Sequence, residues 1–111
     1  MNDLEDFSKH INDFNYRCLA IKKKISRVFS INLNFEPVNA EKPRYYNSRL
    51  RAYVRESQHG VIRSFNNLSK QLQQLRLAPP VSLYDNADWS TVDQALKQIE
   101  NKVNKYCRGR L

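Results

Sequence analysis

The segment from Leu4 to Val28 reads LEDFSKHINDFNYRCLAIKKKISRV. Its apolar residues follow one another at steps of three and four, at Leu4, Phe7, Ile11, Phe14, Cys18, Ile21, Ile25 and Val28. This spacing is typical of one face of an α-helix. Asn2, followed three residues later by Glu5, resembles a capping box, and the period is lost after Phe29. The sequence therefore predicts a first helix at about residues 3–29.

The chain changes its pattern after this helix. Between residues 30 and 43, Ile31, Leu33 and Phe35 alternate with polar residues. A period of two indicates extended chain. Because no other segment offers a partner strand, we expect an ordered crossing loop that packs these three side chains against the helices.

Two more segments have helical spacing. The second helix is predicted at about residues 44–77, with Pro43 suited to its first turn and a bend or break near Ser57 to Gly60. A linker over residues 78–87 follows, and the third helix is predicted at about 88–108. Asp88 and Ser90 are both candidates for its amino-terminal cap.

Each predicted helix has a single apolar stripe, and three such stripes must bury one another. The sequence therefore predicts one all-α domain over residues 1–111, an up-down-up three-helix bundle with a long central helix. A straight second helix would be about 50 Å long and would extend beyond its neighbours. A kink would shorten this overhang, and a homodimer would cover its excess apolar surface.

The composition restricts the class of protein. The chain has 111 residues, and 19 Lys and Arg against 11 Asp and Glu give a net charge of +8. This is too little material for a multidomain enzyme. There is no apolar run of the roughly 18 residues that a membrane span needs, and no signal peptide is evident, so we expect a cytoplasmic protein without membrane partners.

In an up-down-up bundle most of the basic residues would share one end. The candidate binding residues are Arg17, Lys22, Lys23, Lys24, Arg27, Arg44, Tyr45, Arg49, Arg51, Arg55, Lys102, Lys105 and Arg108. Helix dipoles favour cations at helix carboxyl termini, but they do not explain arginines early in the second helix. Arginine suits phosphate oxygens, and tyrosine can stack on bases. We therefore expect non-specific binding of nucleic acid, DNA or RNA. The alternative is a helical interaction module (an adaptor, assembly factor or inhibitor) that docks on an acidic protein.

No pattern in the sequence indicates catalysis or metal binding. Cys18 and Cys107 have no metal-binding spacing, and His10 and His59 are far apart. Two glycines in the whole chain are too few for a phosphate-binding loop. We expect reduced cysteines, no cofactor, no metal and no enzymatic activity.

Overall fold

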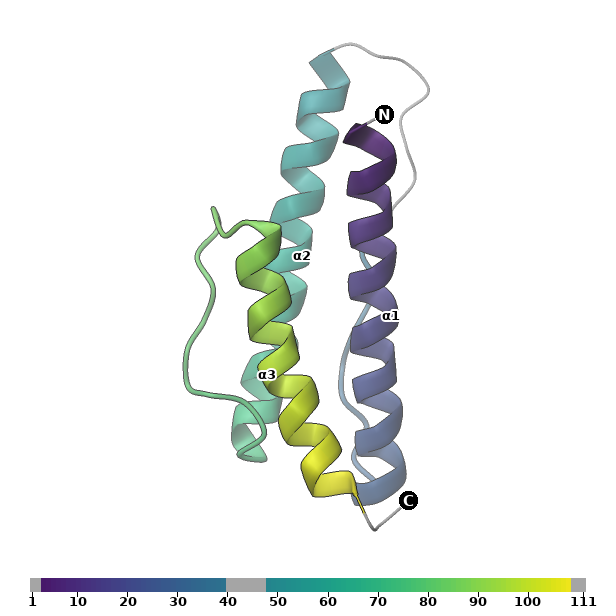
Figure 1. The fold of residues 1–111 in the computed structure, drawn as a ribbon, viewed down its shortest axis with the longest axis vertical. Helices are drawn as coiled ribbons and strands as arrows, with labels where there is room; N and C mark the ends of the chain where they lie inside the picture. The colour runs from purple at the N-terminus through teal and green to yellow at the C-terminus, as the bar shows by residue number, and fades with distance from the viewer. Residues whose placement is uncertain (1–2, 40–47, 109–111) are drawn as a thin grey trace.

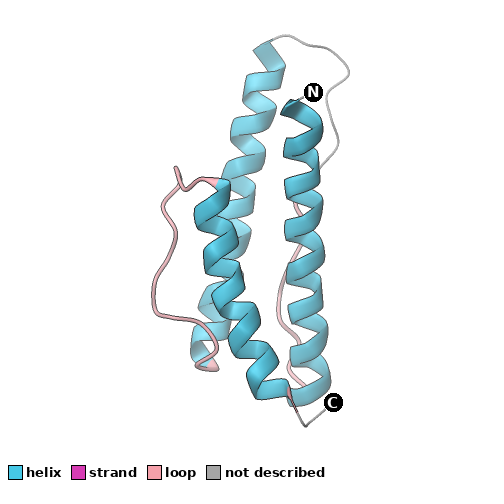
Figure 2. Cartoon of the chain, in the orientation of Figure 1, coloured by secondary structure: helices cyan, strands magenta, loops and turns pink. Residues whose placement is uncertain are grey.

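The computed structural model describes residues 3–39 and 48–108, and their side chains from residue 7 in the first range and from residue 52 in the second. These residues form three α-helices and no strand: α1 (Asp3–Phe29), α2 (Ser48–Gln74) and α3 (Trp89–Cys107) (Figures 1 and 2). The all-α class is therefore confirmed. The bounds of α1 are those that the apolar spacing predicts.

The apolar stripes of the helices meet in one core. Its largest fully buried side chains are Ile11, Ile25, Ile62, Leu68, Leu72, Leu77, Leu96, Ile99, Val61, Val103, Cys18 and Cys107. Every helix contributes to this set. Packing of these apolar stripes supplies most of the stability of such helices, because helix propensity alone contributes little in a protein.

All three helices run in the same direction. Near the start of α1, Phe7 contacts both Tyr53, early in α2, and Trp89, the first residue of α3, with ring centroids 5.9 and 5.5 Å apart. Further along α1, Lys24 donates a hydrogen bond to Asn104 near the end of α3. In Figure 1 each helix starts toward the top and ends toward the bottom. The up-down-up order predicted from the sequence is therefore wrong.

The length of the connection between α1 and α2 allows this direction. At about 3.3 Å per residue, the chain between Phe29 and Ser48 can span about 60 Å. A helix of 27 residues, such as α1, is only about 40 Å long. The connection can therefore return along the whole of α1 before the next helix begins. The described part of this connection, residues 30–39, does run back beside α1, because Val38 lies next to Asn15.

The apolar side chains of residues 30–39 lie where the alternation predicts. Leu33 and Phe35 are buried at 3% and 8% exposure, and Ile31 packs on the core. Phe35 meets Phe14 edge to face at 6.0 Å between ring centroids. The predicted crossing loop packed on the bundle is confirmed in these residues.

Three amide side chains take the place of a partner strand. Asn15 donates to the carbonyl of Val38 and accepts from its backbone N–H, both at 2.8 Å. Gln71 makes the same pair of bonds with Asn34, at 2.8 Å each, and Asn66 makes it with Leu83, at 2.9 and 2.8 Å. Extended backbone left unpaired against a helix would lose hydrogen bonds to water. Each amide satisfies both polar groups of one residue and fixes the position of the connection.

The ends of α1 and α2 use residues in the left-handed conformation, Ser30 (φ 55°) and Arg76 (φ 59°). In α2 the backbone N–H of Arg76 bonds to Gln73 and that of Leu77 to Leu72, a Schellman motif. The helix therefore stops at Gln74, a turn before the predicted end. It is unbroken through Gly60, where a bend or break was expected.

Asp88 forms the amino-terminal cap of α3. Its carboxylate accepts from the backbone N–H of Thr91 at 2.8 Å and from the Thr91 hydroxyl at 2.7 Å. These bonds lower the pKa of Asp88. Of the two candidate caps, Asp88 is thus the one used.

Candidate nucleic-acid interface

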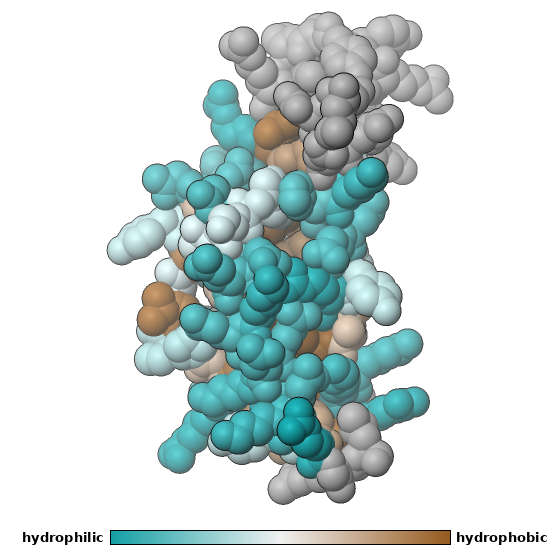
Figure 3. All heavy atoms as spheres, viewed as in Figure 1, coloured by the Kyte–Doolittle hydropathy of each residue, from teal (hydrophilic) through white to brown (hydrophobic). Residues whose placement is uncertain are grey.

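Basic side chains gather at the end of the bundle where all three helices finish, which we call the carboxyl end. They come from the second half of α1 and the last turns of α3, and they are Lys22, Lys23, Lys24, Arg27, Lys102, Lys105 and Arg108. Lys22 and Lys24 are half-buried, and the other five are exposed. Figure 3 shows hydrophilic side chains projecting around the lower part of the visible face. The parallel direction of α1 and α3 brings these two groups together.

The arginines at the start of α2 are not part of this cluster. Arg49 and Arg51 lie in the first turn of α2, and Arg55 is exposed one turn later. Tyr53 contacts Phe7, so this part of α2 lies beside the first turns of α1, about 25 Å along the helix axis from Lys24. The juxtaposition of these arginines with the α1 lysines, inferred from an up-down-up order, is therefore wrong. Arg44 and Tyr45 lie outside the described residues.

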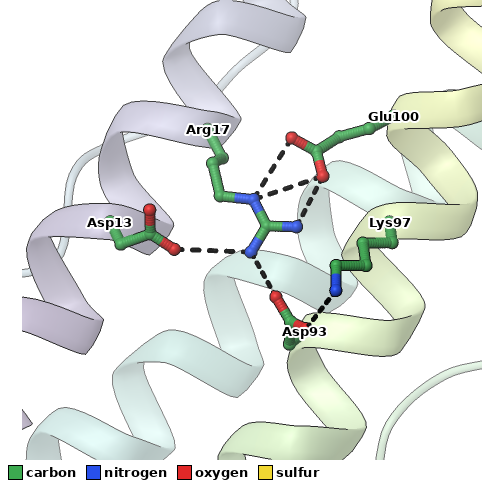
Figure 4. A network of polar contacts seen from close by, with 5 residues as sticks. All are labelled: Asp13, Arg17, Asp93, Lys97 and Glu100. Atoms are coloured by element: carbon green, nitrogen blue, oxygen red, sulfur yellow. Dashed lines mark hydrogen bonds and ion pairs between the residues drawn. The ribbon is translucent and has the colours of Figure 1, made fainter.

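Arg17 is held by carboxylates of the chain itself (Figure 4). Its guanidinium bonds to Glu100 through Nε and Nη2, the latter at 2.5 Å, and to Asp93 through Nη1 at 2.6 Å. Asp13 is 3.4 Å from the same Nη1. The hydrogen bonds to Glu100 raise the pKa of Arg17, and those from Arg17 lower the pKa of Asp93. Arg17 therefore joins α1 to α3 and has little capacity left for a ligand.

The carboxyl end has little negative charge to offset its lysines and arginines. Glu100 is the carboxylate nearest to it among the described residues of α3, and Arg17 already pairs with it. Each helix carboxyl terminus contributes about −0.5 charge, or about −1.5 for three parallel helices. That dipole stabilises the cations, but it is far smaller than the charge of the side chains. A net positive field remains at this end.

Two basic residues that the sequence reasoning missed belong to the same end. Lys70 and Arg76 lie at the end of α2 and are exposed. The up-down-up order predicts that the end of α2 lies at the opposite end of the bundle from the α1 lysines, and so does not group Lys70 and Arg76 with them. With the correct direction, their positions near the end of an amphipathic helix are the signal that would have identified them.

A groove lies on the outer side of α1, next to the start of the first connection. It has a volume of about 520 Å³ and is lined by Tyr16, Leu19, Ala20, Lys22, Lys23, Ser26 and Asn32. Tyr16 is 75% and Leu19 39% exposed. This groove combines apolar surface with two lysines of the carboxyl end.

A second groove, of about 360 Å³, runs between α1 and α3. His10 stacks on Trp89 in its wall, with ring centroids 5.0 Å apart, and Arg17 with its carboxylates lies along it. Within its lining, Arg17 is paired with Asp13 and Asp93. A third groove of about 530 Å³ separates residues 34–38 from α2.

Both cysteines are buried and unpaired. Burial raises the pKa of Cys18 to about 12, which makes its thiolate scarce at neutral pH. Within residues 3–39 and 48–108, no group of three His, Cys, Asp or Glu side chains could hold a metal ion. No helix in this part of the chain has the length and apolar character of a membrane span.

Comparisons with protein-family models, with curated proteins and with solved structures give no match for this chain.

Proposed function

We propose that this protein binds nucleic acid through the carboxyl end of its bundle, mainly by contacts to phosphates. The observation that supports this most strongly is the gathering of α1 and α3 cations at this end. Among the described residues of these two helices, the one nearby carboxylate is Glu100, which is already paired with Arg17. A polyanion gains most from such a surface, because it releases counterions when it binds.

The side chains of this surface suggest binding without sequence preference. Five of its seven members in α1 and α3 are lysines, whose ammonium groups act as point charges on flexible stems. Contacts of this kind position a nucleic acid but do not read its bases. We expect the affinity to fall at least tenfold between about 50 and 200 mM salt.

A charge-reversal pair tests the proposal. The first variant carries Lys23→Glu, Arg27→Glu and Lys105→Glu, all exposed positions of the carboxyl end. The control carries Lys9→Glu, Arg55→Glu and Arg63→Glu, which are equally exposed but lie elsewhere on α1 and α2. Both lose the same charge. Fluorescence anisotropy with a labelled oligonucleotide should show at least a tenfold loss for the first variant and a much smaller loss for the control.

Two outcomes would overturn this proposal. Equal losses in both variants would mean that only net charge matters. No binding by the unaltered protein at low salt, with circular dichroism confirming the fold, would mean that nucleic acid is not the partner.

An acidic protein is a second candidate partner, supported by the position of Leu19 beside Lys22 on the surface. The polar stretch 66–74 of α2 suits such an interface poorly. Asn66 and Gln71 are bound to the two connections, and Ser69 is buried. A homodimer stays a prediction, and light scattering on the purified protein is the measurement that tests it.

A further inference from the structure

The groove beside the first connection has an apolar side that no described residue covers. Tyr16 and Leu19 are three residues apart, so they lie on the same face of α1. Their exposures, 75% and 39%, contrast with the nearly complete burial of the neighbouring Cys18 and Ile21. Tyr16 therefore presents a flat aromatic surface to solvent.

The same groove carries positive charge. Lys22 and Lys23 line it, and Lys23 lies two helical turns, about 10 Å, beyond Tyr16 along α1. Ser26 and Asn32 add polar groups near its lower end. An aromatic ring with cations further along the same groove matches the two parts of a nucleotide, the base and the phosphate.

This combination favours one form of nucleic acid. In a duplex the bases are paired and stacked inside, so a duplex would offer this groove only its phosphates. An unpaired strand offers bases that can stack on a tyrosine, and such stacking adds to the affinity at each base. The Asp and Glu side chains of an acidic peptide would supply carboxylates for the lysines but no ring to stack on Tyr16.

We infer that the groove binds single-stranded nucleic acid, with a base stacked on Tyr16 and the adjacent phosphates at Lys22 and Lys23. This inference rests on the proposed function and specifies its substrate class. It makes α1, and not α3, the element that distinguishes a single strand from a duplex. Stacking tolerates every base, so the preference for single strands does not require sequence recognition.

The test compares four probes of about equal length: a thymidine oligomer of about 20 nucleotides, its duplex with the complementary strand, an abasic oligomer with the same phosphates, and poly-glutamate. The unaltered protein should bind the thymidine oligomer at least fivefold more tightly than the abasic one. The single strand should also be preferred over the duplex.

Three variants locate the effect. Tyr16→Leu keeps an apolar helix-forming residue but removes the ring, and it should lose at least fivefold in affinity for the thymidine oligomer while its affinity for the abasic oligomer is unchanged. Tyr16→Phe should bind as the unaltered protein does. The matched control is Tyr84→Leu, which should have no effect. Tyr84 is 83% exposed and lies in the connection between α2 and α3, residues 75–88.

The outcomes separate this inference from the proposed function. If thymidine, abasic and duplex probes bind equally and binding of all three remains sensitive to salt, the carboxyl end binds nucleic acid but Tyr16 does not stack on a base. The inference is then wrong. If Tyr84→Leu loses as much as Tyr16→Leu, the groove is not the site. If poly-glutamate binds more tightly than every oligonucleotide, the partner is an acidic protein and both proposals are wrong.

Discussion

The two ends of this bundle differ in what their side chains do. At the amino end, where the helices begin, Phe7 lies between Tyr53 and Trp89, and Trp89 in turn stacks on His10. At the carboxyl end exposed lysines and arginines surround the last turns. One end joins the helices by aromatic contact, and the other leaves its charges available to solvent.

This difference follows from the shared direction of the helices. In an antiparallel bundle the dipoles of neighbouring helices oppose each other, and cations favoured at carboxyl termini are spread over both ends. Here every carboxyl terminus is at one end, so the favoured cations accumulate there. Helix direction, and not only net charge, therefore produces a basic surface.

The largest expected effect is the loss of stability when a core side chain is removed at either end of the bundle. Ile25→Ala, near the carboxyl end, and Phe7→Ala, at the amino end, both remove buried side chains and should each lower the free energy of unfolding by about 3 kcal/mol. Urea denaturation measures this. We expect the unfolding free energy of both variants to fall at the same rate with urea concentration, because one core spans the bundle. A separate transition in either variant would show that the ends unfold independently.

Replacing one amide that holds a connection should have the next largest effect. Asn15→Asp removes the donor to the Val38 carbonyl and places a carboxylate against it, which should cost about 2 kcal/mol of unfolding free energy. Asn12→Asp is the control, an exposed position on the same helix. The cost should shrink at acidic pH, where the introduced carboxyl group is protonated and can donate again. Equal stability of the two variants at neutral pH would contradict the account.

Two arginines of α1 should separate stability from binding. Arg17→Met leaves Glu100 and Asp93 without their partner and should cost about 1 kcal/mol of stability, with little change in affinity for nucleic acid. Arg27→Met, at an exposed position in the last turn of α1, should weaken binding and lose only the smaller interaction with the helix dipole, about 0.3 kcal/mol. Thermal unfolding and fluorescence anisotropy check the two properties. The reverse pattern would place Arg17 in the binding surface.

Placing a glycine at the end of α1 should raise the stability of the folded protein slightly. Ser30 has φ 55°, which costs a residue with a side chain more than it costs glycine, so Ser30→Gly should add about 0.5 to 1 kcal/mol of stability. Ser26→Gly, one turn earlier within the helix, should lose about as much. A shift in melting temperature of the same sign in both variants would be inconsistent with this geometry.

The smallest effect concerns acid stability. Hydrogen bonds from Arg17 lower the pKa of Asp93 in the folded protein. The carboxylate thus contributes stability that is fully present above its unfolded pKa of about 3.9 and is lost as the pH falls through its lower folded value. Asp93→Asn should make unfolding less dependent on pH in this acid range. An unchanged pH profile would mean that the contact with Arg17 adds nothing.

The sequence predicts local structure here better than topology. The apolar spacing from Leu4 to Val28 defines α1, and the alternation of Ile31, Leu33 and Phe35 correctly predicts a packed extended segment. The length of that segment allows a return along α1, whereas the simpler antiparallel rule predicts the opposite direction for α2. The error moved Arg55 to the wrong end and left out Lys70.

The polar contacts could not be predicted from the sequence. Asn15, Asn66 and Gln71 look like ordinary exposed residues of a polar helix face, because their partners are backbone groups far along the chain. Arg17 is similar, since it has one partner on its own helix, Asp13, and two that the packing of α3 supplies. Such pairings depend on the three-dimensional arrangement and not on local pattern.

The most direct test of the account measures helix direction in solution with pairs of spin labels. One protein carries Arg27→Cys with Arg76→Cys, and the other carries Arg27→Cys with Arg55→Cys; Cys18 and Cys107 are buried and should label poorly. The parallel arrangement predicts about 20 Å or less for the first pair and a clearly longer distance for the second, which is separated by about 27 Å along the helix axes alone. A longer distance for the first pair than for the second would contradict the parallel bundle, and with it the gathering of basic side chains at the carboxyl end.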